Sequence, residues 1–211
     1  MLPHLGRLVQ GAGITAAVSL AAILIGAPLG MGVCALRRQG GIPGWLARGY
    51  ISLFRGTPLL VQLLVLFYVP GAVGISMTPL SAALLGLALN TASFQAEIYR
   101  AGFEALPRGQ AEAARALGLG AWQRTLLVLL PQVVRLVLPN LTSEAVDILK
   151  NSALVSVIAV TDLLRIGQQV TAVTYRPLEA YLAVAALYWI LTSALGLAGH
   201  AAERRLAVAS R

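Results

Sequence analysis

Apolar residues follow one another along this chain in long runs that contain no charged side chain. The three longest runs are bounded by charged residues, at Arg7 and Arg37, at Arg55 and Glu97, and at Glu179 and Glu203. A helix needs about 20 apolar residues to cross the hydrocarbon core of a bilayer, so the first and last runs each predict one membrane span. The middle run predicts two spans, because the prolines and glycines of the segment VPGAVGISMTP (69–79) are typical of a turn.

A further apolar stretch, 125–166, is interrupted by charged side chains. These are Arg135, Glu144, Asp147, Lys150, Asp162 and Arg165. With one span counted here, the chain has about five transmembrane helices, at 12–36, 52–72, 78–103, 126–149 and 180–202. The apolar piece SALVSVIAV is too short to cross a bilayer, so we expect 151–176 to be a re-entrant or interfacial segment buried against protein. The pattern predicts an all-α integral membrane protein with a single transmembrane domain, 1–211.

The composition agrees with a membrane protein. Hydrophobic residues make up 58% of the chain, charged residues 11%, and the mean hydropathy is +0.79, whereas a soluble domain averages roughly 25% charged residues. The first apolar run is longer than the roughly 7–15 residues expected in a signal peptide and is closed by Arg37 and Arg38, so we expect a retained span. The single cysteine, Cys34, lies inside this span, which excludes a disulfide framework.

The arginines predict the orientation of the chain in the membrane. The formal net charge is +8, but the arginines cluster beside apolar runs, which indicates membrane orientation rather than a nucleic-acid partner. The clusters are Arg37, Arg38 and Arg48 after the first span, Arg108, Arg115 and Arg124 around the 104–124 loop, and Arg204, Arg205 and Arg211 in the tail. The positive-inside rule therefore places the first loop, the 104–124 loop and the C-terminus in the cytoplasm, with the N-terminus outside.

The 104–124 loop holds a short predicted helix. Pro107 favours a helix start and Gly118 a helix end, and the sequence RGQAEAARAL between them favours helix. Alanines at 113, 114 and 116 give this helix a small-residue surface that the cleft of a partner protein could accept. From the residues alone, a surface helix without any partner is an equally good interpretation.

The same loop resembles the EAA loop of permease subunits of ATP-binding-cassette (ABC) importers. That pattern is EAA, three residues, Gly, nine residues, Ile, one residue and Leu-Pro, and the chain departs from it only by a valine at 128. The resemblance implies a type I ABC importer permease fold in which this loop is a coupling helix that docks on a separate ATPase. The residues implied in coupling are Glu112, Ala113, Ala114, Gly118, Arg108 and Leu117.

Three further segments resemble the permeases for polar amino acids such as histidine, glutamine and arginine. They are RGTPLLVQL (55–63), AEIYRAGFEALPRGQAEAARALG (96–118) and LKNSALVSVIAVTDLL (149–164). The resemblance covers about 50–165 in motif. It implies a second permease subunit, as an identical or a sister chain, two ATPase subunits that carry ATP and Mg²⁺, and an extracytoplasmic amino-acid-binding protein, all at the inner (cytoplasmic) membrane.

The residues themselves give no indication of an enzyme. The only lysine, Lys150, lies in DILKNSA, which is not a glycine-rich phosphate-binding loop, so ATP has to be hydrolysed by another polypeptide. His4, His200 and the single cysteine do not form a metal-ligand pattern, and no serine occurs in a G-x-S-x-G context. We therefore expect no catalytic residue, no metal and no cofactor on this chain.

Acidic residues inside predicted spans are candidates for substrate contacts, because a charge in the bilayer is costly. Glu144 and Asp147 are three residues apart and share one helix face, and Glu97 lies in the third span. Structural ion pairs are the alternative, since Asp147 and Lys150, like Glu97 and Arg100, have the same spacing. Two polar residues at the start of the second span could also line a path, or could bond to backbone groups: Thr57 and Gln62.

Two acids on one face favour a cationic substrate over an acidic one, since like charges repel strongly in a medium of low dielectric constant. We therefore expect a basic amino acid such as arginine, lysine or histidine, with an opine-like derivative or neutral glutamine left open. A stand-alone ion-coupled secondary transporter or small channel is the alternative function. It would explain the buried acids, but not the EAA pattern, and the chain has no internal repeat of the kind such carriers commonly show.

Overall fold

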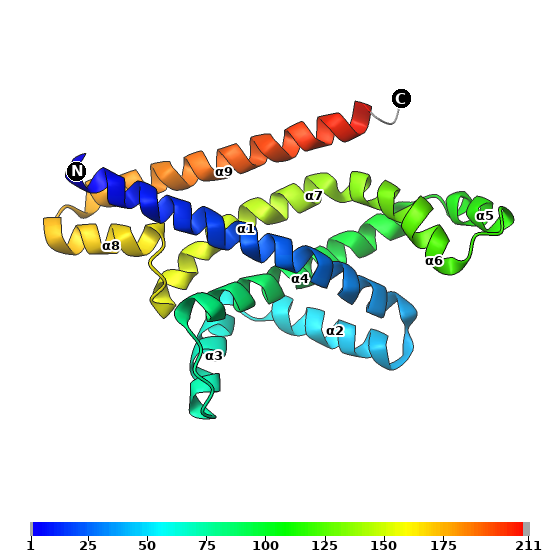
Figure 1. Ribbon diagram of the computed structural model, residues 1–211, viewed down its shortest axis with the longest axis horizontal. Coiled ribbons are helices and arrows are strands. Elements are labelled where there is room, and N and C mark those ends of the chain that lie inside the picture. The colour runs from blue at the N-terminus through cyan, green and yellow to red at the C-terminus, as the bar shows by residue number, and fades with distance from the viewer. Residues whose placement is uncertain (1, 209–211) are drawn as a thin grey trace.

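The computed structural model describes residues 2–208, whose regular structure is entirely helical (Figure 1). The α-helices are α1 (Leu2–Gln39), α2 (Gly41–Gly56), α3 (Leu59–Ala72), α4 (Pro79–Ala105), α5 (Arg108–Ala116), α6 (Ala121–Gln123), α7 (Leu130–Asn151), α8 (Leu163–Thr174) and α9 (Pro177–Val208). A π-helical turn, η1 (Arg124–Leu129), joins α6 to α7, and a 3-10 helix, η2 (Ser152–Ile158), follows α7. The all-α prediction is confirmed.

Three helical stretches are long and apolar enough to cross a membrane. They are His4–Gln39, Ala121–Ile158 and Pro177–Arg205, and they contain the predicted spans 12–36, 126–149 and 180–202. The helix α4 has 27 residues and corresponds to the predicted span 78–103. It carries polar side chains that are buried against other helices, including Asn90, Thr91 and Gln95.

The predicted span 52–72 is not one continuous helix. The chain breaks between α2 and α3, which are bent by 107° relative to each other. Thr57 is extended, with φ −120° and ψ 147°, and Pro58 follows it. Proline lacks an amide hydrogen and disfavours the helical conformation of the residue before it, so the helix cannot continue here. The α2–α3 pair adds a fourth candidate span if it is counted as one broken span.

The helix α1 contributes to all three apolar clusters of the core. Leu8 packs with residues of α8 and α9, Val18 with residues of α3, α4 and η2, and Cys34 with residues of α2, α4 and α7. Two glycines bring α1 close to α4. A Cβ atom at Gly26 would lie 2.4 Å from Cγ2 of Thr91, and one at Gly30 would lie 2.8 Å from the carbonyl oxygen of Ala92. Small residues thus set this helix crossing, as is common in membranes.

The segment 151–176 forms two short helices, neither of which could cross a bilayer. Ala159 has a φ of 67° and ends η2, after which Asp162 caps α8 by accepting a hydrogen bond of 2.9 Å from the amide of Arg165. Val155 and Val170 are fully buried against neighbouring helices. This agrees with the expectation of a segment buried against protein.

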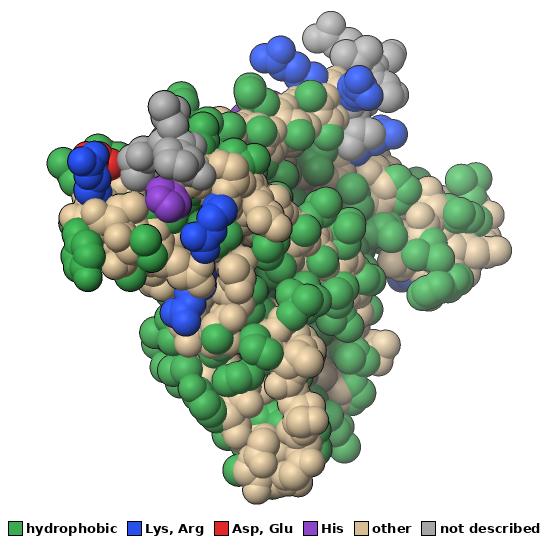
Figure 2. Space-filling view, turned by 60° about the vertical axis from the view of Figure 1, so that its left-hand side comes forward, with side chains coloured by type: hydrophobic (Ala, Val, Ile, Leu, Met, Phe, Trp, Pro, Cys, Tyr) green, Lys and Arg blue, Asp and Glu red, His purple; other side chains and the backbone are tan. Residues whose placement is uncertain are grey.

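The two ends of the molecule carry different elements (Figure 1). The N-terminal end of α1, the helix α8 and the start of α9 lie towards one end of the long axis. The turn between α1 and α2, the helices α5 and α6, and the end of α9 lie towards the other. The first loop, the 104–124 loop and the C-terminal part of α9 therefore share one end, while Arg211 lies outside the described residues. That this end is cytoplasmic stays a prediction. Figure 2 shows apolar side chains over much of the surface between these ends, as expected of a surface that faces lipid.

Candidate functional site

A hollow of about 330 Å³ lies between the α2–α3 break, α4 and α7. Its lining residues are Phe54, Arg55, Thr57, Leu59, Asn90, Phe94, Glu144, Asp147, Asn151 and Leu154. Three of the five predicted substrate-contact residues, Thr57, Glu144 and Asp147, are thus brought together. The other two, Gln62 and Glu97, do not line it.

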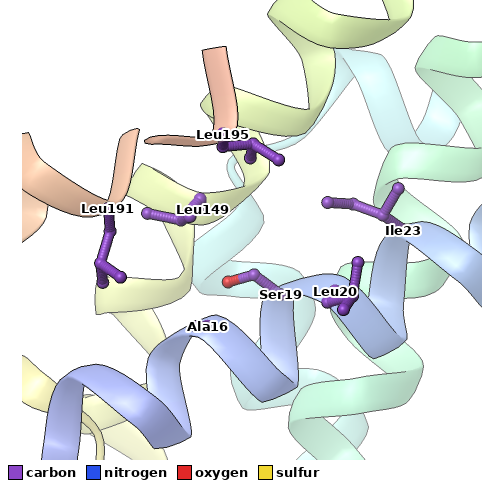
Figure 3. Close-up of a pocket in the computed structure, with 7 residues that line it drawn as sticks. All are labelled: Ala16, Ser19, Leu20, Ile23, Leu149, Leu191 and Leu195. Atoms are coloured by element: carbon purple, nitrogen blue, oxygen red, sulfur yellow. The ribbon is translucent and has the colours of Figure 1, made fainter. Parts of the chain in front are cut away.

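A second hollow, of about 200 Å³, lies between α1, α7 and α9 and is apolar (Figure 3). Figure 3 shows side chains of Leu149, Leu191 and Ile23 around this space. Ser19 is its polar member, but its hydroxyl already donates a hydrogen bond of 2.7 Å to the carbonyl oxygen of Thr15. This second hollow offers no group that could recognise a polar ligand, so the first is the candidate site.

Gln62 does not line the hollow but stabilises the α2–α3 break through hydrogen bonds. Its side-chain amide donates hydrogen bonds to the carbonyl oxygens of Phe54 (2.8 Å) and Thr57 (3.1 Å), and to the hydroxyl of Thr57 (2.9 Å). Its side-chain oxygen accepts a bond of 3.0 Å from Asn90. Carbonyls at the end of α2 have no partner within the helix, and Gln62 satisfies that of Phe54 together with the carbonyl of the extended residue Thr57. Gln62 therefore has the backbone-bonding role that was the alternative to lining a path.

Glu97 lies in a cluster of arginines. Its carboxylate is hydrogen-bonded to Arg37 from α1 and to Nε of Arg100 at 3.0 Å, and it lies 3.9 Å from a guanidinium nitrogen of Arg55 from α2. The side chain is 15% exposed. Removal of one partner from such a partly buried ion cluster is costly, because it leaves an uncompensated charge. Glu97 thus joins three helices, which is the structural role that was weighed against substrate contact.

Glu144 differs from Glu97 in its partners. Its carboxylate accepts a hydrogen bond of 2.9 Å from the hydroxyl of Thr91 on α4. Among the ion pairs of residues 2–208, none involves Glu144. An acid inside a spanning helix that has a hydroxyl partner but no cation can accept a cationic ligand without losing an existing ion pair.

Asp147 lies one turn further along α7 and lines the same hollow. It pairs with Lys150 at 2.7 Å, and both side chains are more than half exposed. An exposed pair of this kind contributes at most about 1 kcal/mol, so a ligand can compete with Lys150 for the carboxylate. The helical spacing of Glu144 and Asp147 therefore brings two carboxylates to one site, as predicted.

Sequence reasoning missed several residues of the hollow. Arg55 lies at its edge, with the guanidinium carbon 5.1 Å from the ring centre of Phe94. Asn90 donates a hydrogen bond to Gln62 and also lines the hollow. The sequence signal for Asn90 was its amide in an otherwise apolar stretch, and the signal for Arg55 was a charge directly before the Thr57–Pro58 break. The site thus combines two carboxylates, a guanidinium, amides and two aromatic rings, those of Phe54 and Phe94.

The helix α5 has the bounds that the loop sequence predicted. Pro107 precedes its first residue, and Gly118, with a φ of 77°, follows its end and accounts for the glycine at this position. Arg108, Glu112, Ala113, Leu117 and Gly118 are exposed, and Leu117 has 80% of its surface accessible. Ala114 is buried, so it packs against the rest of the chain and is not part of the exposed small-residue surface that was predicted.

Comparison with known proteins places the chain in a family. Residues 22–208 match the family described as the binding-protein-dependent transport system inner membrane component. The arginine transport system permease protein ArtQ of Bacillus subtilis is 34% identical over 207 residues, which are 97% of this chain and 94% of ArtQ. The L-cystine transport system permease protein TcyB of the same organism is 36% identical over 163 residues, 77% of this chain and 70% of TcyB. A putative glutamine transport system permease protein, GlnP of Rickettsia conorii, is 32% identical over 98% of this chain and 95% of GlnP.

Solved structures show the same fold. An amino acid ABC transporter crystallised with histidines matches with a TM-score of 0.89 and 35% identity, over 97% of this chain and 96% of that one. The methionine transporter MetNI in an inward-facing conformation matches with a TM-score of 0.83 and 25% identity, over 98% and 99% of the two chains. In this family ATP is hydrolysed by separate subunits, so the chain itself is not an enzyme. The chain belongs to the family of binding-protein-dependent transport system inner membrane components, the permease subunits of ABC importers, and has the type I permease fold.

Proposed function

We propose that this chain is the transmembrane subunit of an ATP-driven importer of a basic amino acid, and that the hollow between the α2–α3 break, α4 and α7 contacts the substrate. The relatives named above transport arginine, glutamine or cystine by their names, which supports an amino acid as the class of substrate. The observation that carries the choice of a basic one is Glu144, a carboxylate in the hollow that has no ion-pair partner among residues 2–208.

The other groups of the hollow suit the rest of a basic amino acid. A substrate with a cationic side chain also carries a carboxylate, and Arg55 presents a guanidinium at the edge of the same hollow. Guanidinium and carboxylate form charge-assisted, often paired hydrogen bonds. Arg55 is available for this, since Glu97 is already bonded to Arg37 and Arg100 and lies 3.9 Å from Arg55. With its carboxylate at Arg55, the substrate would direct its cationic side chain towards Glu144 and Asp147.

The proposed assembly follows the family. Two permease subunits, as identical or sister chains, enclose the pathway in the inner membrane, an extracytoplasmic binding protein delivers the amino acid, and two ATPases with ATP and Mg²⁺ lie beneath. We place α5 and the C-terminal end of α9 on the cytoplasmic side, where α5 docks on an ATPase. Family membership favours this assembly over the stand-alone ion-coupled transporter.

The substitution Glu144→Gln tests the substrate assignment. The importer is assembled with its ATPase and binding protein in liposomes, and ATP hydrolysis is recorded with arginine, lysine, histidine, glutamine or glutamate. We expect selective stimulation by the cationic amino acids, and we expect Glu144→Gln to raise the concentration of arginine needed for half-maximal stimulation by about tenfold or more. A charge-assisted hydrogen bond contributes about 1.5–3 kcal/mol, which corresponds to that change.

Glu179→Gln is the matched control, because Glu179 lies at the start of α9, away from the hollow, and pairs with Arg176 at 3.7 Å. It should leave the response to arginine unchanged. If Glu144→Gln has the same arginine response as the unmodified importer, Glu144 does not contact the substrate. Stimulation by glutamine or glutamate in place of arginine would contradict the choice of a basic amino acid.

A further inference from the structure

Three side chains of α4 form a hydrogen-bonded row that ends at Glu144. The hydroxyl of Tyr99 donates to the side-chain oxygen of Gln95 (3.4 Å), the side-chain amide of Gln95 donates to the hydroxyl of Thr91 (3.1 Å), and Thr91 donates to Glu144 (2.9 Å). Tyr99, Gln95 and Thr91 are four residues apart and are all buried. They therefore lie on one face of α4, one turn above the other.

All the bonds in this row point the same way. A carboxylate only accepts hydrogen bonds, and the hydroxyl of Thr91 has a single hydrogen to donate. Because Gln95 donates to the oxygen of Thr91, the hydrogen of Thr91 is left free for Glu144. Hydrogen bonds in a buried row also strengthen one another through polarisation. The row thus fixes one oxygen of Glu144 and leaves the other for a ligand in the hollow.

The helix α1 holds the row in place through its glycines. Gly26 lies so close to the methyl group of Thr91 that a Cβ atom there would be 2.4 Å from it, and a Cβ atom at Gly30 would be 3.0 Å from Cβ of Gln95. The hydroxyl and the methyl of a threonine share one carbon atom, so a contact that fixes the methyl also fixes the hydroxyl. The close packing of α1 on α4 therefore directs the hydroxyl of Thr91 towards α7.

We propose that Thr91 is a positioning residue for substrate selectivity: held by Gly26 and Gln95, it orients the carboxylate of Glu144 so that the importer prefers a cationic side chain to a neutral one of the same shape. This proposal rests on the proposed function. A site built to pair with a charged group discriminates strongly against an analogue that lacks it, provided that its own polar groups are held in the right geometry. Thr91 supplies that geometry without touching the substrate.

The test measures equilibrium binding of arginine and of citrulline, its neutral analogue of nearly the same shape, to the permease assembled with its ATPase and without the binding protein, so that only the permease site is reported. Thr91→Val keeps the shape and removes the hydroxyl, and it should weaken arginine binding about tenfold while citrulline binding and basal ATP hydrolysis stay unchanged. Thr91→Ser keeps the hydroxyl and its bond from Gln95 but loses the methyl that Gly26 contacts, so its arginine affinity should lie between those of the unmodified chain and Thr91→Val. Thr192→Val is the control, since its hydroxyl bonds to the carbonyl oxygens of Tyr188 and Trp189 within α9. An unchanged arginine affinity in Thr91→Val, or an equal loss for both ligands, would overturn the proposal.

The double variant Thr91→Val/Glu144→Gln separates this proposal from the assignment of Glu144. If Thr91 acts through Glu144, then Thr91→Val should have no further effect once Glu144 is neutralised. If Glu144→Gln alone weakens arginine binding but Thr91→Val does not, only the positioning role is wrong. If Glu144→Gln has no effect on arginine binding, the substrate assignment is wrong and the positioning role is wrong with it.

A second pair of variants tests the contact with α1. Gly26→Ala places a methyl group against that of Thr91, and we expect the same loss of arginine selectivity as in Thr91→Val. The double variant Gly26→Ala/Thr91→Ser removes the methyl of Thr91, which is the nearest atom to the new methyl, and leaves the carbonyl oxygen of Ala88 at 3.2 Å. Its arginine affinity should rise to that of Thr91→Ser alone. Failure of the serine to recover it, in an importer that still binds citrulline normally, would contradict the proposed contact.

Discussion

At the scale of single residues, the chain gives two similar glutamates different surroundings. Glu97 is surrounded by Arg37, Arg55 and Arg100, whereas Glu144 has a hydroxyl partner and faces a hollow. Both are acids in predicted spans, so residue type does not separate them. What separates them is which side chains the other helices bring near, and that depends on packing between residues as far apart in sequence as 37 and 97.

Asp162 is a third acid with a role of its own. It lies between spanning helices, is fully buried, caps α8 through the amide of Arg165, and accepts a hydrogen bond of 3.3 Å from the hydroxyl of Tyr188. Burial raises the pKa of its carboxyl above the usual range, and the hydrogen bonds oppose this only in part. The folded chain therefore holds the proton of Asp162 to a higher pH than the unfolded chain does.

This difference predicts a pH dependence of stability. Because the folded state binds the proton more tightly, the contribution of Asp162 is most favourable below the unfolded pKa, and it declines as the pH rises through the raised folded value. Asp162→Asn keeps a good helix cap and an acceptor for Tyr188, so this part of the pH dependence should vanish. The measurement is the thermal denaturation midpoint of the purified chain from acidic to neutral pH, with Glu179→Gln as control. The same pH profile for Asp162→Asn and the unmodified chain would contradict the prediction that Asp162 contributes to the pH dependence of stability.

At the scale of elements, the break between α2 and α3 builds the site. It divides the predicted span 52–72 into two helices, and it exposes Thr57 to the hollow while Gln62 bonds to Thr57 from the other side. The sequence predicted the helices α1 and α9 well, because a long charge-free run has few other ways to satisfy its backbone in lipid. It did not predict the break, although Arg55, Gly56 and Pro58 interrupt the apolar pattern there, because the pattern gives no sign of the side chains that hold the bend.

Gln62→Leu tests how the break is held. The leucine has similar size but leaves the carbonyl of Thr57 without this partner, and it leaves Phe54 and Asn90 with only the 3.4 Å bond between them. Each buried polar group left unsatisfied costs about 1–3 kcal/mol, so the variant should denature at a clearly lower temperature. Hydrogen exchange of the amides at 57–62 should also become faster. Gln169→Leu is the control, because that side chain forms an exposed bond with Arg7; equal losses in the two variants would show that Gln62 has no special role.

At the scale of the whole molecule, the predicted coupling surface and the site belong to different elements. The predicted coupling surface is on α5, at one end of the long axis (Figure 1), whereas the site lies between the α2–α3 break, α4 and α7. The start of α9 lies at the end opposite α5. The family resemblance carried the prediction of a coupling helix, since the residues alone allowed a helix without a partner. The hydrogen-bonded row from Tyr99 to Glu144 could not be predicted from the sequence, because it depends on how α1, α4 and α7 pack against one another.

Leu117→Ser tests the coupling role of α5. Leu117 directly follows the last residue of α5 and is highly exposed. Burial of a leucine side chain in a docking groove contributes about 1.5–3 kcal/mol. Its truncation to serine should therefore weaken association with the ATPase by about tenfold or more, measured by titration of the purified ATPase. Leu178→Ser at the start of α9 removes a leucine of similar exposure from the opposite end and should leave association unchanged. If both variants bind the ATPase as the unmodified chain does, α5 does not couple through Leu117.

The course of α1 through all three core clusters has a consequence for biogenesis. In synthesis α1 precedes its neighbours, yet Leu8 and Ala12 are covered by α8 and α9, which come last. The face of α1 with Gly26 and Gly30 likewise packs against α4, which is synthesised later than α1. Because α1 is synthesised before α8 and α9, we expect Leu8 and Ala12 to face lipid until these later helices have been inserted. We therefore expect the insertion of α1 to precede its tertiary packing, with the later helices assembling against it.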